Sequence, residues 1–181
     1  MSADELHELQ ESAEHAQRNR GMAPVSLTMA VLAVLVAVVA LLGHRAHTEE
    51  LVLQTKSTDQ WAFYQAKNIR RHNDEFFVDI TSITPVTDAT ALGKLREKYS
   101  EEAERYKEEQ KEIEADARKL EQEVSTERNR ADRFDLAEVF LEIGLVITSI
   151  TLMSGRRLFW HLGIVMALVG VVVALTGFVA H

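Results

Sequence analysis

Two long stretches without charge restrict the fold of this chain more than any other feature. Residues 25–43 and 158–180 contain no Asp, Glu, Lys or Arg, although these residues make up 27% of the chain. A bilayer core of roughly 30 Å is crossed by about 20 apolar residues in a helix. Both stretches reach that length, so the sequence predicts an integral membrane protein held in lipid by helices.

The full pattern predicts an all-α membrane protein with three spanning helices and a helical insert between the first and the second. The spans are expected at residues 22–43, 134–154 and 158–180. A polar, acidic tail (1–21) precedes them, and a short basic loop (155–157) joins the last two.

The middle span carries acidic residues. Its charge-free part, 143–154, is too short to cross a bilayer alone, so the span must extend back past Glu142 and Glu138. Asp135 shares their helical face because the three are spaced by three and four. This intramembrane acidic face could mark an ion or proton path. Alternatively, it anchors the helix by pairing with His44 and Arg45.

Small residues form stripes along the two apolar spans. Such stripes let helix backbones approach closely in lipid, where packing drives association. The stripe of the first span is Ala30, Ala33, Ala37 and Ala40. The ridge of the last span is Gly163, Ala167, Gly170, Ala174 and Gly177. We expect the ridge to meet the first span or another copy of the protein.

The insert, residues 44–133, is predicted to be a helical hairpin with its turn near 81–88. Its second half has heptad spacing, which is typical of a coiled-coil seam. The seam comprises Leu92, Tyr99, Ala103, Tyr106, Ile113, Ala117, Leu120, Val124, Ala131 and Phe134, and it is interrupted by Arg96, Gln110 and Glu127.

The first half of the insert is less regular. One broad face is expected to meet the seam, and it consists of Leu51, Thr58, Ala62, Ile69, Phe76 and Ile83. Thr84 and Pro85 resemble a helix start, with Thr as cap and Pro in the first turn. Residues 76–80 could instead form a short strand.

Three large aromatic side chains lie within four residues of the insert. Trp61, Phe63 and Tyr64 cannot all face one partner helix. They are therefore candidates for contact with another protein, and the alternative is a hydrophobic cluster inside the hairpin.

Basic residues favour one orientation in the membrane. Arg18 and Arg20 precede the first span, and Arg156 and Arg157 fill the loop before the last. Short loops rich in Lys and Arg stay in the cytoplasm. We therefore expect a cytoplasmic N-terminus and an extracytoplasmic hairpin. Four arginines argue against this orientation because they flank the membrane on the hairpin side: Arg45, Arg128, Arg130 and Arg133.

Composition narrows the functional classes. The chain has no cysteine, which excludes disulfides and thiolate chemistry. Its net charge of −8 argues against binding to nucleic acid. His44 and His47 have a spacing that could bind a metal, but chance pairs of this kind are common, so no metal or cofactor is expected. No phosphate-binding loop or catalytic motif is found, so we do not expect an enzyme.

The order of these features resembles a known family. The chain has an acidic tail, a span, the run DQWAFYQAK at 59–67 and a charged helix with YKEEQ at 106–110. A second span, an Arg-Arg loop and a last span beginning LFW at 158 follow. This resembles the bacterial membrane proteins grouped as domain of unknown function 4337. The resemblance implies a bacterial inner membrane and no particular activity.

Two functions are compatible with the pattern. The first is a structural or interaction protein that associates with itself, or with a membrane complex as an accessory subunit, through the hairpin and the small-residue faces. The alternative is a small oligomeric transport or channel component in which Glu138 and Glu142 line a polar path.

Overall fold

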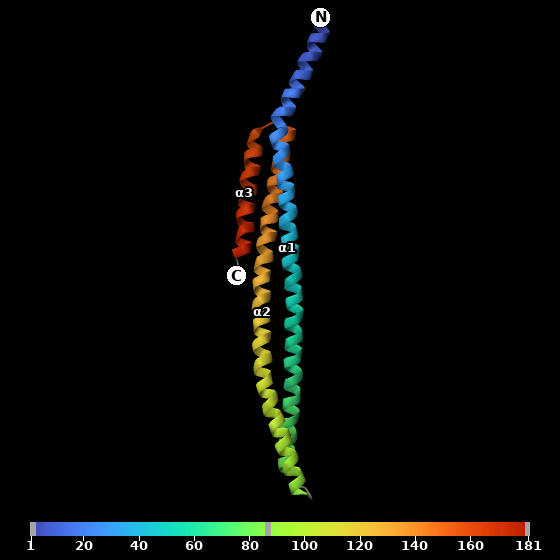
Figure 1. Cartoon of the computed structure of the whole chain (residues 1–181), viewed down its shortest axis with the longest axis vertical. Helices are drawn as coiled ribbons and strands as arrows, with labels where there is room; N and C mark the ends of the chain where they lie inside the picture. Colours follow the sequence, from blue (N-terminus) through green and yellow to red (C-terminus); the bar gives the residue numbers. More distant parts are fainter. Residues whose placement is uncertain (1–2, 86–87, 180–181) are drawn as a thin grey trace. The chain divides into compact units, whose positions relative to one another are not determined.

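Over the residues that it describes, the computed structural model contains helices and the short connections between them, and no strand. It describes the backbone of residues 3–85 and 88–179, and the side chains of 22–85 and 88–179. The helices are α1 (Ala3–Ile83), α2 (Ala89–Ser154) and α3 (Arg157–Val179), shown in Figure 1. All three are long and apolar enough to cross a membrane, judged by length and composition. The prediction of an all-α chain with three such helices is confirmed, and the alternative of a strand at 76–80 is wrong.

The chain divides into two compact units. The first unit comprises residues 1–47 and 128–181, and the second comprises residues 48–127. Helices α1 and α2 each contribute one part to both units, whereas α3 belongs to the first alone. The boundaries of the insert predicted from the sequence lie nearby, between residues 43 and 44 and between residues 133 and 134.

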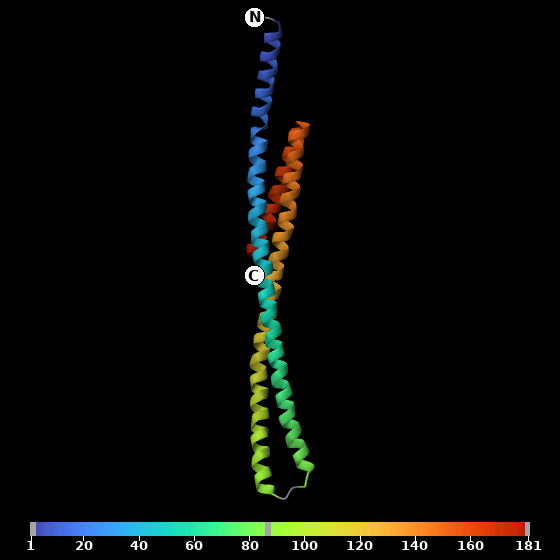
Figure 2. The ribbon, with the colours of Figure 1, turned by 90° about the vertical axis from the view of Figure 1, so that its right-hand side faces the viewer.

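The first unit is built around a cluster of buried apolar side chains from all three helices. Helix α1 contributes residues spaced by seven, Leu32, Val39 and Ala46, so they lie along one face. Helix α2 contributes Phe134 and Leu141 among others. Ala167 and Ala174 of α3 complete the cluster. Figure 2 shows the three helices of this unit side by side.

Helix α3 approaches α2 closely through its glycines. A Cβ atom added to Gly163 would lie 2.7 Å from the carbonyl oxygen of Gly144. One added to Gly170 would lie 3.0 Å from the carbonyl oxygen of Ala137. The glycine ridge therefore meets the second span, whereas the sequence led us to expect the first span or another copy of the protein. The reason is the short connection between α2 and α3, which makes these two helices antiparallel neighbours.

Gly155 forms that short connection. Its φ of 67° is the left-handed conformation that glycine adopts readily at a helix C-terminus. Its N–H donates to the carbonyl oxygen of Thr151 at 2.8 Å, which satisfies one of the last carbonyls of α2. Helix α3 then begins at Arg157, and its Trp160 indole N–H donates to the Thr28 hydroxyl of α1 at 3.1 Å.

The second unit is an antiparallel pair formed by the C-terminal part of α1 and the N-terminal part of α2. The heptad positions of α2 face α1, and the buried ones include Ala103, Ile113, Ala117 and Val124. The face predicted for α1 is wrong. Leu51, Thr58, Ala62, Ile69, Phe76 and Ile83 are all exposed. The inward stripe instead begins with Leu53 and Ser57 and continues through half-buried, mostly polar residues.

The residue that caps the second helix of this hairpin differs from the one predicted. Thr84 follows α1, and its hydroxyl donates to the carbonyl oxygen of Ile80. The start of α2 is capped by Asp88, whose Oδ1 accepts from the N–H groups of Thr90 at 3.1 Å and Ala91 at 2.9 Å. Pro85 disfavours helical geometry at the residue before it, so the Thr-Pro pair ends a helix here. An Asp cap is as favourable as a Thr cap, and Asp88 supplies it.

The close glycine contact predicts an asymmetry between two Gly→Ala substitutions. In Gly163→Ala the new methyl group would overlap the α2 backbone, so we expect destabilisation by about 1–3 kcal/mol. In the control Gly93→Ala the methyl group meets nothing within 4 Å. Helix propensity should then stabilise the control by up to about 1 kcal/mol. Thermal unfolding in a mild detergent measures both, and equal effects would contradict the contact.

Candidate interaction site

The aromatic segment of α1 divides between the inside and the outside of the hairpin. The Trp61 indole N–H donates to Glu121 Oε1 of α2 at 2.9 Å. Tyr64 packs edge-on against Trp61 with ring centroids 5.5 Å apart. Phe63 is 49% exposed and lies on the outside. Of the three residues predicted to contact a partner, two are therefore partly covered by the hairpin and one is accessible.

A lysine links these aromatic residues to α2. Lys67 Nζ donates to Glu109 Oε2 at 2.5 Å. It also lies 5.4 Å from the Phe63 ring centroid and 4.9 Å from that of Tyr106, which are cation–π distances. The hydrogen bond from Lys67 holds the pKa of Glu109 below its ordinary value, although burial acts in the opposite direction. Lys67 therefore contacts Glu109 and Tyr106 of α2 as well as Phe63 of its own helix.

The hairpin interior remains polar beyond this contact. Gln110 of α2 is buried at a heptad position, and Asp74 of α1 has one carboxylate oxygen that is buried and accepts no hydrogen bond among the described residues. Burial raises the pKa of Asp74, and the nearby Glu102 carboxylate raises it further, while Arg105 lowers it. An interior of this kind fixes the register of two helices more than it stabilises them.

Sequence reasoning missed this polar interior because it assigned the most apolar face of α1 to the contact with α2. One signal was available. Ser57, Tyr64, Arg71 and Val78 are spaced by seven, as are Leu53, Gln60, Lys67, Asp74 and Thr81. All of these residues are buried or half-buried, so the spacing was regular even though the chemistry was not hydrophobic.

The outer face of α1 in the second unit is apolar and exposed. We define it as Ala62, Ala66, Ile69, Asn73, Phe76, Ile80 and Ile83, and all seven are exposed. The exposed fractions of its large side chains are 61% for Ile69, 65% for Phe76, 43% for Ile80 and 83% for Ile83. In contrast, the exposed side of α2 carries charged pairs such as Lys111 with Glu108 at 2.7 Å. Large exposed apolar patches usually mark interaction surfaces.

The three acidic residues that the sequence predicts within the membrane do not share one environment. Asp135 pairs with His47 at 2.9 Å, and both side chains are about half exposed. The sequence suggested His44 and Arg45 as partners of Glu138 and Glu142; His47, one turn further along α1 than His44, is the residue that reaches Asp135. Glu138 is half-buried and Glu142 is exposed on α2. Among residues 22–85 and 88–179, no group of three His, Asp or Glu is arranged to hold a metal.

The two sets of small residues also lie in different places. The ridge residues Gly163, Ala167, Gly170, Ala174 and Gly177 are the buried residues of α3. On α1, Ala30, Ala33 and Ala37 are exposed and Ala40 is half-buried. The alanine stripe is therefore left accessible by the chain's own helices, whereas the glycine ridge is occupied by α2.

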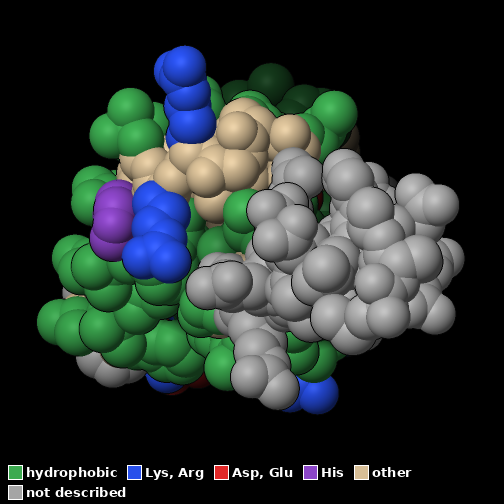
Figure 3. All heavy atoms as spheres, turned by 90° about the horizontal axis from the view of Figure 1, so that it is seen from above, with side chains coloured by type: hydrophobic (Ala, Val, Ile, Leu, Met, Phe, Trp, Pro, Cys, Tyr) green, Lys and Arg blue, Asp and Glu red, His purple; other side chains and the backbone are tan. Residues whose placement is uncertain are grey.

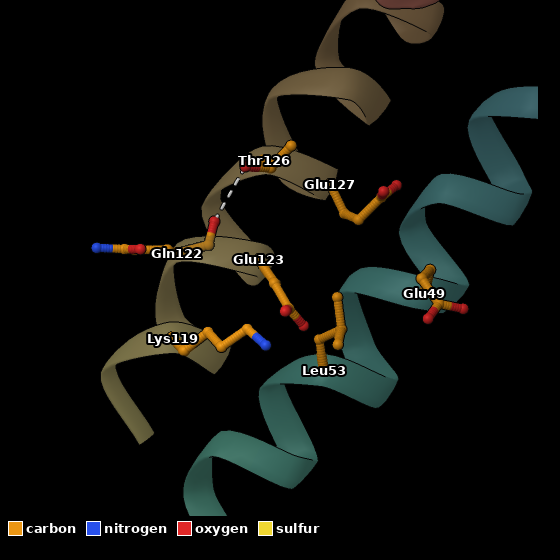
Figure 4. Close-up of a pocket in the computed structure, with 7 residues that line it drawn as sticks. All are labelled: Glu49, Leu53, Lys119, Gln122, Glu123, Thr126 and Glu127. Atoms are coloured by element: carbon orange, nitrogen blue, oxygen red, sulfur yellow. Dashed lines mark hydrogen bonds between the residues drawn. The ribbon is translucent and has the colours of Figure 1, made fainter. Parts of the chain in front are cut away.

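Two further surfaces carry polar side chains. An open groove in the second unit is lined by Glu49, Leu53, Lys119, Gln122, Glu123, Thr126 and Glu127. Figure 4 shows Lys119 and Glu123 extending from α2 toward Leu53 of α1, while Gln122 points away. The view in Figure 3 shows basic side chains and a histidine among hydrophobic ones.

Comparison with known proteins identifies the family. Residues 21–180 match the family described as Domain of unknown function (DUF4337). The chain belongs to this family. No curated protein and no solved structure shows significant similarity to it. Membership in the DUF4337 family agrees with the resemblance seen in the sequence, and it supplies no activity.

Asp74 has one buried carboxylate oxygen, so replacing this side chain by an uncharged one should increase the stability of the folded protein in a pH-dependent way. Because the folded-state pKa is raised, folding is disfavoured at neutral pH and this cost disappears as pH falls below the ordinary value of 3.8. We expect Asp74→Asn to unfold at a higher temperature than the natural protein at pH 7, with the difference vanishing in acid.

Asp79→Asn is the matched control for this measurement. Asp79 lies exposed on the same helix, so its replacement should change the unfolding temperature little at any pH. Circular dichroism melts of both variants at pH 7, and at lower pH values down to below the ordinary aspartate pKa of 3.8, measure this difference. A destabilised Asp74→Asn protein at pH 7 would contradict the assignment.

Proposed function

We propose that this member of the DUF4337 family is a membrane-anchored structural or interaction protein without catalytic activity. It associates with itself, or with a larger membrane complex as an accessory subunit, through the hairpin of the second unit and the small-residue stripe of α1. The lipid bilayer is its other partner. No cofactor or nucleic acid takes part.

The observation that carries this proposal is the contrast between the two exposed sides of the hairpin. The outer face of α1 offers Ile69, Phe76 and Ile83 to its surroundings, whereas the exposed side of α2 is charged. Inside the hairpin, the ammonium group of Lys67 pairs with the carboxylate of Glu109. This pattern favours a binding role for the apolar face, and a structural role for the polar groups.

The proposal includes a bacterial inner-membrane location with a cytoplasmic N-terminus. Arg156 lies between α2 and α3, Arg157 begins α3, and both side chains are exposed. Short basic loops are retained in the cytoplasm. Three spans then place the hairpin and the C-terminus on the outside. Arg18 and Arg20, the other residues used in this argument, lie outside the residues whose side chains the structure describes.

A transport or channel component is the second candidate function. It is supported by Glu142, which is exposed on a helix apolar enough to span a membrane, and by the half-buried Glu138. Carboxylates at membrane depth often serve ion or proton pathways. In a three-span chain, such a path would require several copies to surround it.

Replacing Glu142 by Gln distinguishes the two functions. We expect the mass of Glu142→Gln in native lipid particles, and its unfolding temperature, to match those of the natural protein, because assembly does not need this charge. Glu97→Gln, at an exposed position of the second unit, is the control. Proton flux into liposomes that the natural protein supports and Glu142→Gln abolishes would establish the transport function instead.

The mass of the extracted protein tests association directly. Static light scattering of the protein in mild detergent, with identification of any co-purifying chain, should give a multiple of 20.4 kDa or a defined complex with another protein. A lone monomer in both detergent and native lipid particles would overturn the proposed function.

A further inference from the structure

We infer that the outer face of α1 binds the same face of a second copy of this chain, in parallel and in register, with the two Asn73 side chains opposite each other. This inference rests on the proposed function and specifies the surface, the occupant and the geometry of the association.

The outer face has its own heptad register. From Ala62 to Ile83, its seven residues are separated by four, three, four, three, four and three positions. This spacing keeps them on a single line when two helices wind around each other. All seven side chains are exposed, so the line is uninterrupted in the second unit.

The outer face is separate from the contact with α2. The inward stripe of α1 includes Tyr64, Lys67, Arg71 and Asp74, which fall on two other heptad positions. Successive residues of a helix are rotated by about 100° around its axis. The two heptad positions of the outer face and the two heptad positions of the inward stripe therefore lie on opposite sides of α1. Helix α2 cannot cover both sides of α1, so the apolar outer face requires an occupant from outside the chain.

The membrane determines the direction of pairing between two copies. Each copy is held by helices that cross the bilayer in one orientation, and so α1 of one copy must run in the same direction as α1 of the other. In a parallel arrangement, identical residues of the line meet across the contact. Ile69, Phe76 and Ile83 would then each pack against their equivalents.

Asn73 supports two parallel helices in particular. Asn73 is the one polar residue of the outer face and lies near its middle. It comes four residues after Ile69 and three before Phe76, so Asn73 occupies the a position of a heptad. Asparagine at a single a position costs stability, but it selects a two-stranded contact in one register because the two amides bond to each other. A purely lipid-facing surface would gain nothing from an amide at this place.

The charges that flank the outer face are compatible with this pairing. In a parallel pair, the residue directly before each a position is the g position of the heptad. It faces the e position of the other copy, whose residue number is higher by five. Gln65 faces Arg70 in this way, and the contact brings no like charges together. The next two positions do not take part, because Phe77 packs against Tyr99 of α2 and Thr84 lies beyond the end of α1. On the exposed side of α2, Glu104 and Glu108 are instead engaged in ion pairs with Lys107 and Lys111 of the same helix.

The natural chain has no cysteine, so single introduced cysteines report this contact without interference. Ala66→Cys lies on the outer face and Ala115→Cys on the exposed side of α2, and both replace an exposed alanine. Disulfides form only when the two Cβ atoms come within about 4.5 Å. With the full-length protein in native lipid particles and a mild oxidant, we expect Ala66→Cys to give several times more cross-linked dimer than Ala115→Cys.

A mixture of two differently tagged variants, Ala66→Cys and Ile80→Cys, tests the direction of pairing. Ala66 and Ile80 are equally far from Asn73 along the sequence, so the two introduced thiols would meet each other only in an antiparallel pair. In a parallel pair these positions are about 21 Å apart along the helix. We expect each variant to cross-link with another copy of the same variant, so that each dimer carries a single kind of tag. Predominant cross-links between unlike variants would overturn the parallel geometry.

The mass measurement separates the failure of this inference from the failure of the proposed function. A dimer without preferential cross-linking at Ala66→Cys overturns the outer face as the contact and leaves self-association standing. A defined complex with another protein, again without that cross-link, overturns the second copy as occupant and leaves the accessory-subunit role. A monomer overturns both.

Discussion

The contact between one narrow stripe of α1 and the heptad positions of α2 is the constraint on which the second unit depends. Because that stripe is mostly polar beyond Ser57, the hairpin is held by matched groups such as Lys67 with Glu109 as well as by burial of Ile113 and Val124. Surface and half-buried ion pairs contribute little stability, typically below about 1 kcal/mol each. Their value lies in fixing which residues of the two helices are opposite each other.

Much of the architecture could be predicted because membrane helices are defined by length and apolarity. The three spans required only those quantities, and the heptad positions of α2 are regular enough to identify the side that faces α1. The face of α1 could not be predicted in the same way. Hydrophobic periodicity identifies the most apolar side, which includes Ile69 and Phe76, and it contains no information on whether that side faces a neighbour within the chain.

One local prediction failed because two signals for a helix start lie close together. Thr84–Pro85 and Asp88 each have the chemistry of a helix start, and only the three-dimensional path of the chain selects Asp88. The pairing of His47 with Asp135 could not be found from the sequence, because His44, Arg45 and His47 lie within one turn of α1 and spacing alone does not separate them.

The glycine contact between α2 and α3 bears on how the chain enters the membrane during biosynthesis. A segment that carries Glu138 and Glu142 partitions less well into lipid than a wholly apolar one when it leaves the translocation machinery alone, since ionisable residues within a span oppose insertion. Helix α3 follows after only a short break at Gly155 and Arg156 and is strongly apolar. The two helices can therefore enter the bilayer as a preformed pair, in which α3 supplies the hydrophobicity that α2 lacks.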